Sequence, residues 1–415
     1  MKAGDKLGKM LRRSVLLGLG LAALAGGKVE AQTWRRRPPP LWRLPPGPRR
    51  RARMAAWRQA ILARRRANLA RFIWVRRHEQ ALRGEILAIN PSPGAIAHAR
   101  ELGFTRLRAS GDGAYGVRIV VLAAPPNMTT EAALARLEAD DPQGAYEFNH
   151  VYDPSQAHVE PAPSATPMAV PLRNGAGVKI GMIDSGVSTD HPALRGGAIQ
   201  TQSFAGDGRP TPSPHGTAVA SLLVGRDGEF HGIAPGAQLL AADVFGESVE
   251  GGSAEAIANA LIWMAHEGVN VVNISLTGPP NRGLDAVCRA MMARGMILVA
   301  AVGNDGPTSP VAYPAAIAGV VAVTAVDAAH RVLLTANRGP EIAFSSYGVS
   351  VTAAVDDGGY ETMSGTSFAA PLVTAELALR SRATSGQQAL QSLSASALDL
   401  GAPGRDDIYG YGFVV

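Results

Sequence analysis

The stretch at residues 178–187, VKIGMIDSGV, decides the fold of this chain. It reads as an apolar strand over 178–183 that ends at Asp184, with Ser185-Gly186 turning the chain away. Near-continuous apolar runs of this length are typical of parallel strands that helices cover on both faces. In open sheets of this kind the functional side chains follow the carboxyl ends of strands, so Asp184 is a candidate site residue.

The same alternation of strand and helix continues to the C-terminus. We predict a doubly wound, mostly parallel α/β sheet from this alternation. Further strands are expected at 238–244, 269–275, 296–302 and 320–326, and helices at 217–224, 254–266, 284–293 and 368–380.

Three other positions carry residue types suited to acyl transfer. His215 precedes an apolar helical run, and a helix N-terminus favours a neutral imidazole that can act as a base. Ser367 opens another expected helix behind Gly365, where small residues let a peptide backbone approach. Asn304 follows the strand over 296–302 and offers an amide donor for a developing oxyanion. Each has an ordinary alternative, a turn or loop residue, when taken alone.

Together these segments resemble the subtilisin-like serine peptidase (subtilase) family. The matching stretches are MIDSGV at 182–187, HGTAVAS at 215–221, AAVGN at 300–304 and GTSFAAP at 365–371. The chain order Asp, His, Ser is that of subtilisin. The resemblance covers residues 171–415, which we expect to form a subtilisin-like peptidase domain.

The resemblance implies a role for each residue. Ser367 would be the nucleophile, His215 the general base and then acid, Asp184 the residue that orients His215, and Asn304 the oxyanion donor. The activity implied is that of a serine endopeptidase with protein or peptide substrates. Substrate-binding positions implied by the family are Ser275, Leu276 and Gly278 along the peptide, and Ala300, Ala301 and Gly303 at the specificity pocket.

A small domain is expected upstream, at residues 84–152. Its predicted order, β-α-β-β-α-β, is the ferredoxin-like split unit, an α+β arrangement. It resembles the inhibitory propeptide of the family, so the chain would be made as a zymogen that its own propeptide inhibits within the molecule. We expect self-cleavage near Tyr152, followed by a Pro/Ala-rich linker over residues 153–170.

The N-terminus is typical of an exported protein. Residues 1–31 form a signal peptide with a charged start, a short apolar stretch and small residues before the expected cut, which favours a periplasmic or extracellular location. Residues 32–83 are rich in Arg and Pro and have no counterpart in the simplest family members. We interpret them as a solvated extension or linker. Met54, Trp57, Ile61 and Phe72 interleave with Arg there, which leaves membrane contact open.

Charge is divided unevenly along the 415 residues. Residues 1–83 hold 22 Lys and Arg against 3 Asp and Glu, whereas residues 84–415 hold 18 against 31. The acidic body argues against nucleic-acid binding. One cysteine, Cys288, excludes an intrachain disulfide and reads as a buried structural thiol. We expect a monomer without a cofactor or a metal ligand set, although structural calcium is possible in this family.

Other functional classes fit the sequence less well. A zinc peptidase would need HExxH, which neither His78-Glu79 nor His266-Glu267 completes. An α/β-hydrolase elbow would need glycine where Ala369 stands, and a different triad order. Two alternatives stay open: a non-catalytic peptide-binding module on a peptidase fold, and a membrane-held processing factor anchored by residues 1–83.

Overall fold

The computed structural model describes most of the chain from Pro48 onward: residues 48–76, 79–111, 113, 115–155, 173–206 and 208–415. The predicted signal peptide, the start of the Arg/Pro-rich segment (32–47) and residues 156–170 of the expected linker lie outside the described residues. Everything described belongs to one unit, Pro40–Val415.

A seven-stranded parallel sheet forms the centre of residues 173–415, which we call the body. Its order is β16-β15-β14-β12-β7-β11-β8. The strands are β7 (Lys179–Asp184), β8 (Ile199–Ser203), β11 (Gln238–Asp243), β12 (Val271–Ile274), β14 (Ile297–Ala301), β15 (Val321–Val326) and β16 (Ile342–Tyr347). The five predicted strands are confirmed, and β8 and β16 at the two edges are additional.

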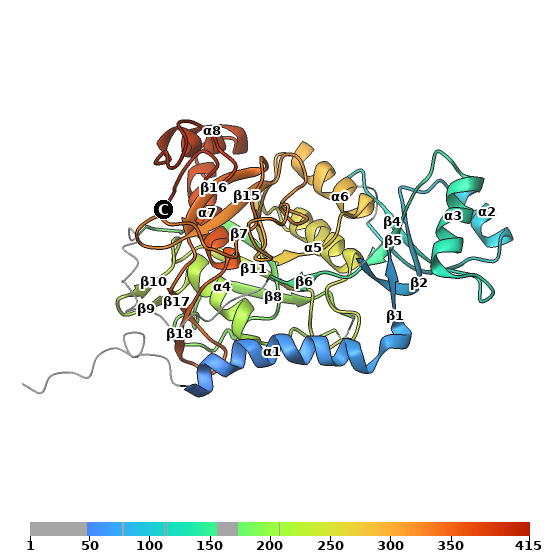
Figure 1. Cartoon of the computed structure of the whole chain (residues 1–415), viewed down its shortest axis with the longest axis horizontal. Coiled ribbons are helices and arrows are strands. Elements are labelled where there is room, and N and C mark those ends of the chain that lie inside the picture. The colour runs from blue at the N-terminus through green and yellow to red at the C-terminus, as the bar shows by residue number, and fades with distance from the viewer. Residues whose placement is uncertain (1–47, 77–78, 112, 114, 156–172, 207) are drawn as a thin grey trace, which may run out of the picture. The chain divides into compact units, whose positions relative to one another are not determined.

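Helices cover both faces of this sheet, as a doubly wound fold requires (Figure 1). Successive strand residues point to opposite faces: Leu239 packs in the core with α4 (Pro214–Val224) and α7 (Thr366–Ser381), and Leu240 in the core with α5 (Ala254–His266) and α6 (Arg282–Ala293). The four predicted helices are confirmed. The remaining elements of the body are α8 (Gly386–Ser396), β9 (Arg226–Asp227), β10 (Phe230–His231), β13 (Leu276–Thr277), β17 (Val351–Ala354) and β18 (Tyr360–Met363).

Upstream lies a second sheet with its own helices, which we call the N-terminal module. Its elements are β1 (Phe72–Val75), β2 (Glu79–Ile89), α2 (Pro93–Glu101), β3 (Thr105–Ser110), β4 (Ile119–Ala123), α3 (Thr130–Asp140) and β5 (Ala145–His150). From β2 to β5 the order is the predicted β-α-β-β-α-β. The sheet is antiparallel in the order β1-β2-β4-β3, and β5 also pairs antiparallel with β2, along Ala81 and residues 86–89.

The sheet of the N-terminal module serves two cores at once. Ile86 and Ala88 face the core that α3 covers. Leu87 and Ile89, which alternate with them, join the core around α5 and α6 of the body. The period-two alternation of β2 therefore attaches the module to the body through one sheet face.

The expectation of a solvated spacer is wrong for residues 48–75. Residues Pro48–Ala67 form a 20-residue helix, α1, which packs beside α4 (Figure 1). Met54 and Ile61 on it are 4% and 6% exposed, because they pack into the two cores of the body. The apolar side chains that could enter a membrane are thus covered by protein. Among the described residues, no helix combines the length and hydropathy needed to cross a bilayer.

The boundaries predicted for the module also need correction at both ends. After a short 3-10 turn, η2 (Leu69–Arg71), strand β1 pairs with β2, so the sheet begins at Phe72 rather than at residue 84. At the other end the expected linker does not begin at residue 153. Residues 153–154 form a strand, β6 (Asp153–Pro154), paired antiparallel with β13 of the body. We call residues 151–155 the tail.

Candidate active site

Asp184 ends β7 with its side chain wholly buried. Its Oδ1 accepts hydrogen bonds from the backbone N–H of Ser185 at 2.6 Å and from Ser185 Oγ at 2.8 Å. The turn after β7 therefore fixes one oxygen of Asp184 at the carboxyl edge of the sheet.

His215 lies in the first turn of α4. Ser213 caps this helix by accepting from the backbone N–H of Gly216 at 3.0 Å, and Pro214 follows, so the helix begins three residues earlier than predicted. Nδ1 of His215 lies 2.8 Å from Asp184 Oδ1. Since an ionised carboxylate only accepts, the proton is on Nδ1 and Nε2 is left able to take another.

Ser367 is the second residue of α7 and is wholly buried beside this pair. The ring of Phe368, the next residue, lies 5.5 Å from the His215 ring, and the Ser367 carbonyl accepts from Ser275 Oγ at 3.2 Å. Neither Ser367 Oγ nor His215 Nε2 has a hydrogen-bond partner among the described residues. The start of α7 thus contacts the imidazole through the Phe368 ring, and no hydrogen bond joins the two described groups, the hydroxyl and the imidazole.

Asn304 follows β14 and reaches the start of the same helix. Its Oδ1 accepts from the backbone N–H of Thr366 at 3.0 Å, and its Nδ2 donates to Ser155 Oγ at 2.9 Å. Gly303 donates its N–H to Thr366 Oγ1 at 3.3 Å. The amide is therefore oriented by α7, with its donor turned toward the tail. The four residues singled out from the sequence thus come from β7, α4, β14 and α7 to one place.

The positions predicted to align a peptide hold a strand of this chain. β13 contains Leu276, and its residues pair with β6, Leu276 opposite Pro154 and Thr277 opposite Asp153. On the other side of the tail, Tyr152 donates its backbone N–H to Gly252 O at 2.7 Å. The tail is therefore held between two segments of the body in the way that an added peptide strand would be.

The side chain of Tyr152 fills a closed site against Gly278. Tyr152 is wholly buried, and its hydroxyl donates to Pro279 O at 2.8 Å. A Cβ on Gly278 would stand 2.3 Å from the tyrosine ring, so only glycine leaves room for it there. Burial raises the pKa of Tyr152 well above its usual value, which keeps the hydroxyl protonated and able to donate.

Of the three residues expected at the specificity pocket, two point into the cores of the body and one lies beyond the end of β14. Ala300 and Ala301 are wholly buried, and their side chains enter the two cores on opposite faces of β14. Gly303, just beyond the strand, has φ of +105° and would bring a Cβ to 2.7 Å from Asn337 Nδ2. Its backbone, rather than the two alanine side chains, lies beside Asn304. The pocket role of all three stays a prediction.

Several contributors were not singled out from the sequence. Ser185 and Ser213 hold the turn beneath Asp184 and His215, with their hydroxyl oxygens 2.6 Å apart. Thr366 links α7 to Gly303 and Asn304, and Ser155 meets Asn304. The Ser213-Pro214 pair is a recognisable helix start and could have been found; the partners of Ser185 and Ser155 depend on the fold.

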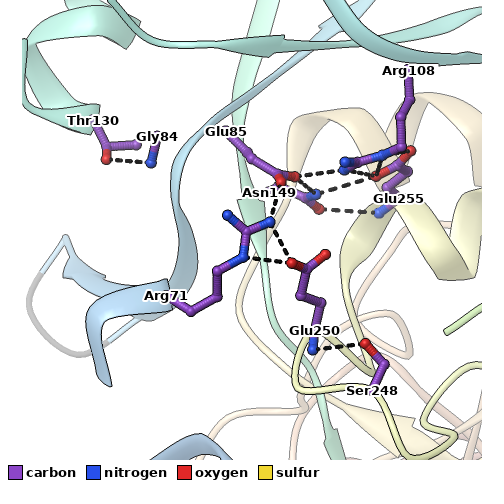
Figure 2. A network of polar contacts seen from close by, with 9 residues as sticks. All are labelled: Arg71, Gly84, Glu85, Arg108, Thr130, Asn149, Ser248, Glu250 and Glu255. Carbon is purple, nitrogen blue, oxygen red and sulfur yellow. Dashed lines mark hydrogen bonds and ion pairs between the residues drawn. The ribbon is translucent and has the colours of Figure 1, made fainter. Parts of the chain in front are cut away.

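A network of ionised groups joins the N-terminal module to the start of α5, as Figure 2 shows. Arg108 donates to Glu85 at 2.7 Å and to Glu255 at 2.6 Å, and both carboxylates are buried. Hydrogen bonds to these acids raise the pKa of Arg108 further. Arg71 also pairs with Glu85, and Asn149 donates to it at 2.9 Å. The two arginines therefore compensate the buried carboxylates at the contact between the module and α5.

Cys288 lies apart from these residues, in a core of the body. In the part of the chain that the structure describes, no group of three or more His, Cys, Asp or Glu side chains could hold a metal ion. Cys288 is wholly buried in the core that α5 and α6 share, where burial raises the pKa of its thiol. This placement fits the structural role expected for it.

Comparison with known proteins gives consistent matches for the body. The family model described as the Subtilase family matches residues 175–412. The Minor extracellular protease Epr of Bacillus subtilis is 34% identical over 251 residues, which are 58% of this chain and 38% of that protein. Subtilisin Savinase of Lederbergia lenta is 35% identical over 250 residues, 58% of this chain and 89% of that protein.

Solved structures extend the match in fold. Fervidolysin from Fervidobacterium pennivorans, described as a keratinolytic enzyme related to subtilisin, superposes with a TM-score of 0.72 at 22% identity, over 82% of this chain and 61% of that chain. A lanthipeptide protease superposes with a TM-score of 0.51 at 27% identity, over 57% and 86%. The first of these likenesses concerns the fold alone. Coverage of the relatives thus ranges from about two fifths to nine tenths of their length.

Proposed function

The chain belongs to the subtilase family, and from this we propose that it is a serine endopeptidase, made as a zymogen that processes itself. The observation that carries the proposal is the Asp184–His215 hydrogen bond of 2.8 Å, with the His215 ring packed against Phe368, the residue that follows Ser367. Asn304 adds a donor at the same place. These are the parts that acyl transfer needs.

In the proposed mechanism each side chain handles one charge or proton. Ser367 Oγ attacks the carbonyl carbon of the bound peptide bond while His215 Nε2 takes the hydroxyl proton. Asn304 Nδ2 donates to the oxyanion that forms. His215 then gives the proton to the leaving amine, and the Ser367 acyl ester is hydrolysed by water that His215 activates in turn. Asp184 stabilises the imidazolium in both halves.

The tail supports a specific first substrate, the chain itself. Its strand pairing with β13 ends at Pro154, and the hydroxyl of the next residue, Ser155, accepts from the proposed oxyanion donor Asn304. We therefore place the first cut directly after Ser155, three residues later than the bond near Tyr152 that the sequence suggested. Tyr152 then occupies the fourth position before the cut, in the site against Gly278.

The remaining finer roles follow from the same arrangement. Leu276 and Gly278 would align other peptides as they hold the tail, and we propose that Ser275 and Gly303 complete the peptide-binding backbone. The substrates proposed are proteins or peptides in extended form. With residues 1–31 as a signal peptide, we propose that the enzyme acts outside the cytoplasm. The name of one relative, the Minor extracellular protease Epr, describes that protein as extracellular.

Covalent labelling separates an enzyme from a peptide-binding module on the same fold. A fluorophosphonate probe should label processed wild-type protein at Ser367, because the probe reacts with a serine that a base activates. His215→Ala should lose most of the labelling, and Thr308→Ala, an exposed loop change, should keep it. A processed protein with an unlabelled Ser367 would favour the binding module.

A further inference from the structure

One face of helix α1 differs in composition from the rest of the helix, and this face contacts the site just described. Met54, Trp57, Ile61 and Arg65 are spaced three or four residues apart, so they lie along one side of the helix. The helix is otherwise Arg- and Ala-rich, and its Gln59 and Arg66 are exposed. This one face is the part of α1 that packs on the body.

Trp57 covers the imidazole of His215. The two rings are stacked, with centroids 5.6 Å apart and an interplanar angle of 15°. Phe245 supports the tryptophan edge-on at 6.3 Å. An offset aromatic stack of this kind excludes water from the covered ring face and opposes its movement. The histidine proposed to move protons is thus held under a side chain from residues far upstream.

Arg65 ties the same helix to the tail. Its guanidinium donates to Tyr152 O at 2.8 Å and to Gly251 O at 3.0 Å, and it pairs with Asp153 Oδ1 at 2.6 Å. Arg65 is 4% exposed, and burial lowers its pKa. Two of its three acceptors belong to the tail and one to the body, so the arginine is satisfied only while tail and body are together.

Further contacts hold α1 along the body at both ends. Arg53 pairs with Asp356 at 2.8 Å, between β17 and β18, and Arg64 donates to Gly246 O at 3.1 Å. A helix of this length spans about 30 Å, so these anchors are spread widely. The exposed Arg53 pair contributes little energy by itself, whereas the buried Met54 and Ile61 add apolar contact.

We propose that α1 is a second inhibitory element, distinct from the tail, which caps His215 with Trp57 and whose release Arg65 couples to that of the tail. The inference rests on the proposed function for its meaning, since a cap inhibits only if His215 is catalytic. When the tail leaves the cleft, Arg65 keeps one acceptor and becomes a buried, under-satisfied cation. That state is costly, so α1 leaves with the tail.

The cap is tested in the full chain with Ser367→Ala, which stays intact under the proposed mechanism. Diethyl pyrocarbonate modification of His215 is followed by peptide mass spectrometry. Trp57→Ala should raise the rate at His215 by about tenfold, since an aromatic pair contributes energy equivalent to roughly that factor. Trp57→Phe should restore most of the protection. Trp74→Ala, a tryptophan 63% exposed on β1, is the matched control and should change nothing.

One result overturns the cap directly. If His215 reacts equally slowly in Trp57→Ala and in its parent, the tail alone protects the histidine and Trp57 has no capping role. This readout needs no peptidase activity. A positive result combined with active-chain variants that hydrolyse no peptide would keep the cap and reject the proposed function instead.

The coupling through Arg65 has its own measurement. In the same Ser367→Ala background, Arg65→Ala and the milder Asp153→Asn should speed backbone hydrogen exchange in both α1 and the tail, by about tenfold or more for Arg65→Ala because the hydrogen bonds of a buried guanidinium to the tail and the body are lost. Faster exchange in only one of the two segments would contradict coupled release. In the active chain, Trp57→Ala should shorten the lag before hydrolysis of a chromogenic peptide, and an unchanged lag would contradict inhibition by the cap.

Discussion

Helix α5 meets two partners, and it meets them with different chemistry. Toward the parallel sheet of the body it presents Ile257, Leu261 and Met264, all wholly buried. Toward the N-terminal module its first turn presents Glu255, which shares Arg108 with Glu85. An apolar contact has no charge to titrate, whereas ion pairs weaken with salt and when a partner is protonated. The proposed zymogen needs the second contact to be releasable, and its ion pairs are the part that salt and pH can weaken.

The module does not rely on charge alone. Leu87 and Ile89 enter the same core as the inner face of α5, so the ionic network adds to an apolar contact. The module is therefore attached by apolar packing together with ion pairs. A zymogen needs both properties, since its inhibitor must bind firmly before processing and leave afterwards.

Removing the proposed nucleophile keeps the chain intact, so that the contacts of α5 with the sheet and with the N-terminal module can be studied in one molecule. Ser367→Ala should lower peptide hydrolysis by about a millionfold, the loss that subtilisin itself shows, and should leave the chain uncut after Ser155. Chain mass and hydrolysis of a chromogenic peptide measure the two effects, with Thr308→Ala as the control. Cutting at the same bond by the purified variant would contradict self-processing.

Asn304 tests whether the body contributes more than a binding surface. Asn304→Ala should lower kcat by about a hundred- to a thousandfold with KM little changed, which is the size known for the equivalent change in subtilisin. Asn304→Asp is the sharper variant, because it keeps an oxygen for the N–H of Thr366 but loses the donor. Steady-state kinetics on one peptide give both constants; an equal loss in binding and turnover would reject the oxyanion role.

The sequence predicted the body better than its surroundings, and for a physical reason. The strands β7, β11, β12, β14 and β15 are covered on both faces, so their apolar runs are long and unbroken. The edge strands β8 and β16 read IQTQS and IAFSSY, with polar residues that hid them. Edge strands are covered less completely, and their composition carries a weaker signal.

Helix α1 and the site show the other limit of sequence reasoning. Met54, Trp57 and Ile61 are few among many arginines, so composition favoured a spacer, whereas the fold uses those few residues for packing. The motif residues Asp184, His215, Ser367 and Asn304 could be named in advance because their four local stretches, taken together, resemble the subtilase family. Contacts such as Trp57 on His215 join distant segments and leave no local pattern.

The ion-pair network between α5 and the N-terminal module can be weakened by changing one residue. Arg108→Ala leaves the buried Glu85 and Glu255 with fewer partners, and should raise the dissociation constant of the processed module by about tenfold. This loss of affinity is small for a broken buried ion pair, because the Arg108 side chain is 41% exposed and solvent screens its charge. Arg136→Ala, which breaks a surface pair with Asp140 on α3, is the matched control and should have a much smaller effect.

Salt gives an independent measurement of the same network. Raising ionic strength from about 0.1 M to 1 M shortens the screening length from about 10 Å to 3 Å. Dissociation of the wild-type module should respond more than that of Arg108→Ala. Parallel salt dependences for the two proteins would mean that the network adds nothing to the hold on α5.

The smallest expected effect concerns pH and lies in the module beside the tail. His150 is wholly buried, with Nδ1 accepting from Asn281 of the body at 2.9 Å, and burial together with Arg76 lowers its pKa to about 4. Because the pKa of His150 in the complex lies below the ordinary value of 6.5, release that exposes His150 lets the module bind more protons than the complex between pH 6.5 and 4. The contact is therefore complete above pH 6.5 and weakens as the pH falls through this range.

The groups that face His150 reduce the size of this effect. Glu79 lies 3.1 Å from its Nε2 and has a pKa raised by burial, so it takes up a proton in the complex and opposes the loss; Glu147 pairs with Arg76 nearby. We expect the dissociation constant at pH 5 to rise by only about three- to fivefold over pH 7. His150→Gln should flatten the profile and His98→Gln, exposed on α2, should not. Identical profiles for wild type and His150→Gln would show that another group carries the pH dependence.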